Sequence, residues 1–495
     1  MNNTDVFSSL TPPQQEAVRH INGPLLILAG PGSGKTRVVT HRIAHMLQKG
    51  VPAWRVLALT FTNKAADEMR SRVERLVAGR GVWMGTFHSF CARLLRSHAS
   101  LVGLNANYSI YDTDDSKKAL KLAIEESDVD LVRTRPEAIA NAISWAKNNL
   151  VTPEAYIPQE GKPLDAIVQK VYPAYRKRLL ESNAVDFDDL LLHVAMLLKG
   201  SPELRATLDE RYRYILVDEY QDTNLAQYAI VRALSINHSN LAVTGDPDQS
   251  IYGWRGANLN NILDFEKDFN SVKVVRLEQN FRSTPNILRA ADQLIAYNVK
   301  RKPKRLYTEK PDGAPVKLVV YESARDEADD IARSIAEAIN GEKRCPKDFA
   351  VFYRINALSR QLEHALRRAR VPYQVVSGLE FYQRREIKDV LAYLHLLNNP
   401  QNDVAFLRIV NTPSRGIGKK TLERLTAHAR RHGRSLLEAA RESRQVSSIA
   451  KGISAKISRF VAMYDSMCKQ MHGDLFGIIQ CVVQESGYRV WLMES

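Results

Sequence analysis

Two stretches of the chain combine residue types that could bind and hydrolyse a nucleoside triphosphate. In the first, AGPGSGKT, three glycines precede Lys35 and Thr36. Glycines allow backbone N–H groups to surround a phosphate chain, because a Cβ atom would block the approach. Lys35 would then reach the β- and γ-phosphates, and the Thr36 hydroxyl would bind Mg²⁺. The residues expected around the phosphates are Ala29, Gly30, Pro31, Gly32, Ser33, Gly34, Lys35 and Thr36.

The surroundings of this loop favour nucleotide binding over an ordinary glycine-rich turn. Ala29 stands where the strict pattern has its first glycine. The apolar run Leu25–Ala29 predicts a buried strand, and a helical stretch begins at Lys35. A bound phosphate would therefore lie at a helix N-terminus, where the helix dipole stabilises negative charge.

The second stretch supplies carboxylates. The apolar strand predicted at Tyr214–Val217 ends at Asp218 and Glu219, and adjacent carboxylates in this position are the usual partner of a phosphate loop. Asp218 would hold Mg²⁺, and Glu219 would position and deprotonate the attacking water. After the next strand, Leu241–Thr244, Gln249 is placed to sense a γ-phosphate.

Aromatic residues follow the same predicted strands. Tyr252 and Trp254 lie a few residues beyond Gln249, so one loop could contact nucleotide at one end and a stacked base at the other. Phe61 and His88 follow two further strands, where they suit base stacking and phosphate contacts. Packing in the core is the alternative for a phenylalanine at a strand end.

The strands that must position these residues alternate with helical stretches in the order βαβαβ. This order is typical of an α/β protein whose parallel sheet carries helices on both faces and binds ligands at the carboxyl ends of its strands. The strands expected are Leu25–Ala29, Val56–Thr60, Val82–Thr86, Tyr214–Val217 and Leu241–Thr244. Ahead of them, Gln14 could clamp the edge of an adenine with its amide, although a polar residue at a helix start is the simpler interpretation.

Composition points to an anionic partner. The 495 residues include 70 Lys and Arg against 55 Asp and Glu, a net charge of +15. Such a balance fits nucleic acid, although a diffuse positive surface also serves solubility. The four cysteines lack the spacing of a zinc site or a disulfide framework, and neither a signal peptide nor a membrane-spanning run is evident. We therefore expect a cytoplasmic protein.

Six segments in order resemble the superfamily 1 DNA helicases of the UvrD/PcrA/Rep type, with PcrA-like members nearest. They are AGPGSGKT, FTNKAA, GTFHSF, ILVDEYQDTN, VTGDPDQSIYGWRGAN and LEQNFRST. A single motif carries a risk of chance agreement that six in order do not share. The resemblance implies two RecA-like P-loop lobes with parallel sheets, each interrupted by a helical insertion. It also implies ATP-driven movement along single-stranded DNA in the 3′→5′ direction, in DNA repair or replication.

The resemblance extends the nucleotide site. It implies that Gln14 and Arg37 contact the base and sugar, and that Phe281 stacks on the adenine. Arg282 resembles an arginine finger from the second lobe, a group that can be worth about 10³–10⁵ in rate. Phe281 replaces a tyrosine often found there, and Thr11 replaces the usual asparagine. The catalytic residues implied are Lys35, Glu219, Gln249 and Arg282, with ATP and Mg²⁺ as cofactors.

For DNA, the resemblance implies contacts from Phe61, His88, Phe187, Tyr252, Trp254 and Arg255. The expected partners are single-stranded DNA and its junctions with duplex DNA, no membrane, and a monomer or weak dimer. The glycine turn Thr412–Gly418 resembles one that grips duplex DNA, and a plain helix connector is the alternative. The basic run Lys300–Arg305, KRKPKR, is instead expected to be a solvated connection.

The expected first lobe comprises residues 1–104 and 185–273, with a helical insertion at 105–184. Residues 274–385 would begin the second lobe, and residues 386–495 would form a second, truncated helical insertion. Within the second lobe we expect strands at Val316–Tyr321, Phe349–Tyr353 and Gln374–Val376 and helices at Glu327–Ile339 and Leu358–Arg368.

The later segments of the family pattern are not found before Ser495. We therefore expect an incomplete second lobe and a chain that does not unwind DNA alone. Two alternatives stay open: the helicase subunit of a helicase–nuclease, and a DNA-binding fragment without turnover. A switch GTPase is disfavoured, because the sequence has no base-specific Asn-Lys-x-Asp stretch.

Overall fold

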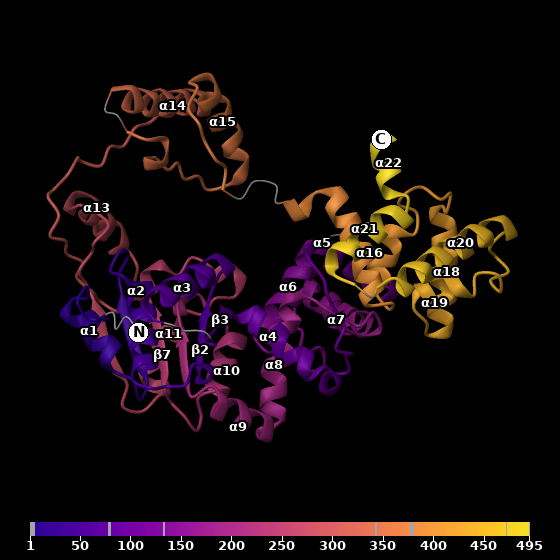
Figure 1. Ribbon diagram of the computed structural model, residues 1–495, viewed down its shortest axis with the longest axis horizontal. Helices are drawn as coiled ribbons and strands as arrows, with labels where there is room; N and C mark the ends of the chain where they lie inside the picture. The colour runs from indigo at the N-terminus through magenta and orange to yellow at the C-terminus, as the bar shows by residue number, and fades with distance from the viewer. Residues whose placement is uncertain are drawn as a thin grey trace. The chain divides into compact units, whose positions relative to one another are not determined.

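The computed structural model describes residues 5–77, 81–131, 134–341, 344–376, 381–471 and 473–494. The chain divides into two compact units, one formed by Met1–Gly313 with Asp389–Ser495 and the other by Ala314–Lys388 (Figure 1). All of the residues predicted at the nucleotide and DNA sites lie in the first unit.

The first unit is built around a six-stranded sheet in which every pair of neighbouring strands is parallel. The α/β class and the parallel sheet are thus confirmed. In spatial order the strands are β3 (Trp83–Thr86), β2 (Val56–Thr60), β6 (Tyr214–Val217), β7 (Leu241–Gly245), β1 (Leu25–Ala29) and β8 (Lys273–Leu277). Strand β8 pairs with β1, so the lobe boundary predicted at Val274 falls inside a strand of this first sheet.

The sheet is buried on both faces, which explains why its strands are continuous apolar runs. Along β1, Leu26 and Leu28 belong to one hydrophobic cluster, whereas Leu25, Ile27 and Ala29 belong to another. Successive side chains of a strand point to opposite faces, so these two clusters are the two sides of the sheet. The helices beside these strands in the chain are α1 (Pro12–Arg19), α2 (Lys35–Gln48), α3 (Asn63–Leu76), α4 (Phe87–Ser97), α8 (Phe187–Gly200), α9 (Pro202–Arg211), α10 (Leu225–Ala233), α11 (Asn260–Leu263), α12 (Phe265–Asp268) and α13 (Pro285–Ile295).

The region predicted as a helical insertion is largely helical. It holds α5 (Thr113–Glu126), α6 (Pro136–Asn148) and α7 (Pro163–Glu181), which share a separate hydrophobic cluster. Two short strands at its ends, β4 (Ser109–Ile110) and β5 (Ala184–Val185), pair in parallel. This pairing brings the start and the end of the insertion together.

The C-terminal region is helical in its described residues, as expected from its apolar stripe. Its helices enclose one hydrophobic cluster centred on residues such as Leu396, Phe406 and Phe460. They are α16 (Arg385–Asn398), α17 (Asp403–Ile409), α18 (Lys419–His432), α19 (Leu436–Arg441), α20 (Lys451–Lys469), α21 (Leu475–Glu485) and α22 (Tyr488–Glu494). The Thr412–Gly418 turn joins α17 to α18, and its contact with duplex DNA stays a prediction.

The second unit differs from its prediction. The two expected helices are present as α14 (Ala324–Gly341) and α15 (Ser359–Arg368), which pack against each other. The three expected strands are not formed: no β-ladder occurs in the described residues of this unit. A strand requires a neighbour for its backbone hydrogen bonds, and here Leu318, Val320 and Phe352 are 92, 87 and 94% exposed.

Across the described residues, no helix has both the length and the apolar character needed to cross a membrane.

Candidate functional site

The glycine loop joins β1 directly to α2, as its sequence predicts. Gly34 has a φ of +88° and Gly32 one of +67°, in the left-handed region that glycine tolerates best. A Cβ atom on Gly34 would lie 2.8 Å from the Nε2 atom of Gln14. Lys35 is the first residue of α2. The loop therefore has the tight turn and the helix N-terminus that phosphate binding requires.

Strand β6 brings its carboxylates to this loop. The Nζ atom of Lys35 lies 3.0 Å from Oε2 of Glu219, and the Thr36 hydroxyl lies 3.5 Å from Oδ2 of Asp218. Burial, followed by the charge of Glu219, raises the pKa of Asp218 to about 6, while Lys35 acts in the opposite direction. A buried carboxylate and a hydroxyl are two oxygen ligands of the kind that Mg²⁺ prefers. A bound cation would offset the burial that disfavours the charged form of Asp218.

A chain of side-chain hydrogen bonds runs from Glu219 to Gln249. Gln221 donates from Nε2 to Oε2 of Glu219 at 2.9 Å, and its Oε1 accepts from the backbone N–H of Asp246 at 3.0 Å. Gln249 in turn donates from Nε2 to Oδ2 of Asp246 at 2.6 Å. The predicted base and the predicted γ-phosphate sensor are thus linked through two residues that the sequence analysis did not single out.

The two residues predicted to contact the nucleotide base and sugar differ in burial: Gln14 is buried, whereas Arg37 is exposed. Gln14 is buried at the N-terminus of α1, where its Nε2 donates to the Ser33 carbonyl at 2.9 Å and its Oε1 accepts from the Thr11 N–H at 3.1 Å. Its amide therefore supports the phosphate loop in this structure. Arg37 lies in the first turn of α2 and is exposed.

The segment that carries the predicted arginine finger packs on the phosphate loop. Asn280 donates from Nδ2 to the Pro31 carbonyl at 2.6 Å, and the N–H of Phe281 donates to the Gly32 carbonyl at 2.9 Å. A Cβ atom added to Gly32 would meet that of Arg282 at 2.7 Å. Asn280 was not predicted; its amide holds the backbone of this segment against the loop.

The predicted DNA-binding residues form two aromatic groups. In one, Phe61 and Tyr252 have ring centroids 4.9 Å apart, Tyr252 and Trp254 lie 6.5 Å apart, and the Arg255 guanidinium lies 4.6 Å from the Trp254 ring. Trp254 is 71% exposed, which leaves its face available to a base. We name this group, Phe61, Tyr252, Trp254 and Arg255, the aromatic cluster.

The other aromatic group is the pair His88 and Phe187, with centroids 6.0 Å apart. Helix capping places both residues. The Thr86 hydroxyl accepts from the Ser89 N–H at the start of α4, and an Asp186 oxygen accepts from the Asp189 N–H at the start of α8. Phe187 remains exposed, and burial lowers the pKa of His88, which favours a neutral ring.

The basic run at 300–305 is not a solvated connection, contrary to its prediction. Arg301, Lys302 and Lys304 each form an ion pair with an acidic residue of the segment 246–266. The charge pattern alone could not reveal this, because the acidic partners lie about 40 to 60 residues earlier in the chain.

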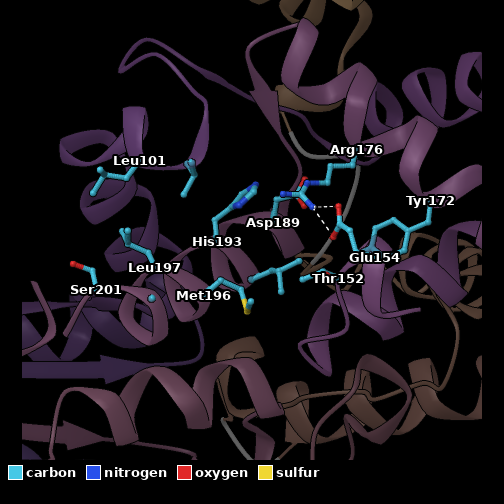
Figure 2. Close-up of a pocket in the computed structure, with 13 residues that line it drawn as sticks. Leu101, Thr152, Glu154, Tyr172, Arg176, Asp189, His193, Met196, Leu197 and Ser201 are labelled. Atoms are coloured by element: carbon cyan, nitrogen blue, oxygen red, sulfur yellow. Dashed lines mark hydrogen bonds and ion pairs between the residues drawn. The ribbon is translucent and has the colours of Figure 1, made fainter. Parts of the chain in front are cut away.

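A cavity of about 650 Å³ lies away from these residues, between α7 and α8 (Figure 2). Figure 2 shows Arg176 bonded to both oxygens of Glu154, at 2.9 and 3.0 Å. Burial lowers the pKa of His193 in the cavity lining to about 4, and the charges of Lys147 and Arg176 act in the same direction. The described lining contains none of the predicted ATP or DNA residues.

Comparisons with known proteins agree with this geometry. The family described as UvrD/REP helicase N-terminal domain matches residues 10–270, and the family described as UvrD-like helicase C-terminal domain matches residues 275–448. The ATP-dependent DNA helicase PcrA of Bacillus subtilis is 44% identical over 470 residues, covering 94% of this chain and 63% of the relative. The ATP-dependent DNA helicase UvrD1 of Mycobacterium bovis is 43% identical over 500 residues, covering 98% and 65%. The chain thus spans less than two thirds of the length of these relatives.

Proposed function

The chain belongs to the UvrD/REP helicase family, and from this premise we propose that it forms the ATP-binding and DNA-binding part of an ATP-dependent DNA helicase. Its substrates are single-stranded DNA and single-strand–duplex junctions, along which the motor moves 3′→5′. The proposal includes two RecA-like lobes, the second represented here by its first part, and work in DNA repair or replication.

One observation carries the proposal. Lys35 and Thr36 of the glycine loop lie within 3.0 and 3.5 Å of the two carboxylates at the tip of β6. An ordinary glycine-rich turn would not bring a lysine and a hydroxyl at a helix start next to two carboxylates at the end of another strand. Phosphoryl transfer requires that combination, because catalysis there depends on positioning and on charge stabilisation.

Each residue then has a chemical task. Lys35 holds the phosphate charge, while Thr36 and Asp218 would hold Mg²⁺, which neutralises charge on the phosphate oxygens when bound. Glu219 accepts a proton from the attacking water, and Gln249 detects the γ-phosphate. Arg282 stabilises charge that develops in the transition state.

The DNA-binding part of the proposal rests on the aromatic cluster. The loop that follows β7 carries Gln249 and then Tyr252, Trp254 and Arg255, so the same loop leads from nucleotide to DNA. Stacking on aromatic side chains is tolerant of sequence, as a motor that travels along a strand requires. The positive net charge of +15 adds attraction to the backbone phosphates.

We propose further that residues 1–495 bind both ligands without separating a duplex by themselves. The described part of 314–388 forms no β-sheet, which a second RecA-like lobe needs as its core. Without a packed second lobe to position it, Arg282 should stabilise the transition state less effectively. Protein partners other than a weak second copy are not part of the proposal.

The experiment measures ATP hydrolysis with and without oligo(dT), beside strand displacement on duplexes with a 3′ or a 5′ tail. A complete helicase that contains this chain should show DNA-stimulated hydrolysis and displacement from the 3′ tail, both lost in Lys35→Ala. Preference for the 5′ tail would contradict the direction. Displacement by residues 1–495 alone, abolished by Lys35→Ala, would contradict the second part of the proposal.

A further inference from the structure

Lys304 is a buried cation attached to the loop that carries Gln249. Its Nζ atom contacts Oδ1 of Asp246 and lies 2.8 Å from Oδ2 of Asp248. The side chains of these three residues are 6, 0 and 6% exposed, respectively. Arg301 adds a second cation, 2.9 Å from the same Asp248 oxygen. By contrast, Lys300 in the same basic run is exposed.

The carboxylate that Lys304 neutralises is also the one that holds the sensor. Oδ2 of Asp246 accepts from the Gln249 amide at 2.6 Å, and Oδ1 accepts from the Asp248 N–H at 3.0 Å. Asp246 therefore caps the short turn on which Gln249 stands, and it fixes the orientation of the sensing amide. We expect the Gln249 amide to exchange this carboxylate for a phosphate oxygen when a γ-phosphate is bound.

Lys304 lowers the cost of that exchange. When Gln249 leaves, Oδ2 of Asp246 loses a hydrogen bond in a fully buried position, and a buried carboxylate without partners is unfavourable. The adjacent ammonium of Lys304 neutralises the charge of Asp246 both when Gln249 is bound to it and when Gln249 has left. Without Lys304, Asp246 would hold the amide more tightly, and its mutual repulsion with Asp248 would distort the turn.

The segment around Lys304 is placed to link this loop to the rest of the site. Leu306 packs so closely on the phosphate loop that a Cβ atom on Gly30 would clash with it. The Tyr307 carbonyl accepts from the Asn280 N–H at 2.7 Å, beside the predicted finger. A single short segment thus contacts the phosphate loop, the sensor loop and the finger segment.

We propose that Lys304 is a positioning residue for the γ-phosphate sensor and so helps the site to distinguish a nucleoside triphosphate from a diphosphate. The inference rests on the proposed function, because Gln249 has a γ-phosphate to detect only if the glycine loop binds ATP. A salt bridge that served stability alone would instead affect both nucleotides equally.

The test uses residues 1–495 with Mg²⁺ and two fluorescent nucleotides, mant-ADP and the non-hydrolysable triphosphate mant-AMPPNP. The parent should bind the triphosphate more tightly. Lys304→Met should weaken triphosphate binding by about tenfold, the worth of a hydrogen bond to a charged group, with diphosphate binding unchanged. Lys304→Arg should restore most of the preference, and Lys300→Met, a lysine of the same run with an exposed side chain, should match the parent.

Two further variants test whether Lys304 acts on triphosphate binding through Gln249. Gln249→Ala should remove the triphosphate preference, and adding Lys304→Met to it should change nothing further. If Lys304→Met does not fold, Asp246→Asn serves instead: the neutral amide holds Gln249 less tightly than the carboxylate does, so the triphosphate preference should rise above that of the parent.

Several results would overturn the inference. They are an unchanged preference in Lys304→Met or Asp246→Asn, equal losses for the two nucleotides, or a parent that binds both alike. Lys35→Ala separates this failure from that of the proposed function. If it abolishes binding of both nucleotides while Lys304→Met has no effect, only the role of Lys304 is wrong. If Lys35→Ala binds both nucleotides like the parent, the nucleotide site itself is wrong.

Discussion

The Nζ atom of Lys35 lies 3.0 Å from Oε2 of Glu219, so the phosphate-binding lysine is paired with the predicted general base. Their side chains are 11 and 35% exposed, which leaves the pair open to exchange. An incoming triphosphate must take Lys35 from the carboxylate, and that exchange frees Glu219 to bind water. The ion pair thus places the two residues side by side at the site.

This pairing predicts opposite effects on binding from its two members. Glu219→Gln removes the carboxylate that competes for Lys35, so the affinity for Mg²⁺–ATP should stay equal or rise. Hydrolysis in a complete helicase should fall by about 10²–10⁴-fold, because the general base is lost. Lys35→Ala should weaken ATP binding instead. Fluorescent-nucleotide titration and a single-turnover assay measure the two quantities.

Glu210→Gln is the matched control, since Glu210 pairs with Arg213 at the surface. It should leave both quantities at the parent values. Hydrolysis at the parent rate in Glu219→Gln would show that another group is the base.

The conformation of the glycine loop predicts a difference between two glycines of similar φ. Gly34 and Gly50 have φ values of +88° and +83°, so alanine at either should cost about 1 kcal/mol of folding free energy. Only Gly34→Ala should also weaken ATP binding, because its Cβ atom would displace Gln14, whereas a Cβ atom added to Gly50 would meet no non-adjacent described atom within 4 Å. Thermal denaturation and nucleotide titration of both variants check this; equal ATP affinities would count against the loop.

The aromatic cluster predicts that an uncharged substitution, Trp254→Ala, lowers the affinity for DNA. Trp254→Ala should cost about 1–3 kcal/mol of single-strand affinity, the usual worth of a stacked base. The dependence of affinity on salt should not change, since no cation is removed. Trp54→Ala is the control, because Trp54 is also exposed, at 52%, but lies outside the cluster. Titration of a fluorescent oligonucleotide at several salt concentrations provides the measurement, and unaltered affinity in Trp254→Ala would exclude stacking there.

His193 predicts a pH dependence of stability. Its pKa in the folded chain, about 4, lies below the unfolded value of 6.5, so the folded state binds protons less readily. Stability contributed by the neutral ring is present above pH 6.5 and is lost as the pH falls towards 4. At pH 5 the loss should be about 2 kcal/mol relative to neutral pH.

His193→Gln removes this titration while keeping a polar side chain of similar length. Denaturant unfolding at pH 7.5 and pH 5 should show a smaller acid destabilisation in the variant than in the parent. The comparison is necessary because burial raises the pKa of nearby Asp186 and Asp188, which acts in the opposite direction. His364→Gln, at an exposed position, should behave like the parent, and an identical pH response in His193→Gln would contradict the assignment.

The sequence predicted those parts of the molecule whose structure depends on residues close to one another in the chain. The glycine loop, the carboxylates after β6 and the strands of the sheet are each encoded in a few consecutive positions, where apolar runs and glycines have direct physical meaning. The pairing of strand β8 with β1 was not predicted, because β1 lies far away in the chain. The sequence of Lys273–Leu277 contains nothing that specifies this partner.

The same limit explains the residues that were missed. Gln221 and Asn280 act through hydrogen bonds to Asp246 and Pro31, and Lys304 acts through Asp246 and Asp248. A lysine in a basic run resembles any solvated lysine until its partners are known. The described residues of 314–388 show the converse, because the predicted strands do not form there: an apolar run predicts a strand, but the ladder also needs a neighbour.

We propose that one lobe binds ATP and single-stranded DNA and couples the two ligands through the loop from Gln249 to Trp254. The most direct measurement is the affinity of residues 1–495 for mant-AMPPNP and Mg²⁺, with and without saturating oligo(dT). We predict that the oligonucleotide changes this affinity, that the nucleotide changes DNA affinity by the same factor, and that Lys35→Ala abolishes nucleotide binding in both conditions. Equal nucleotide affinity with and without DNA, or binding that survives Lys35→Ala, would contradict the account.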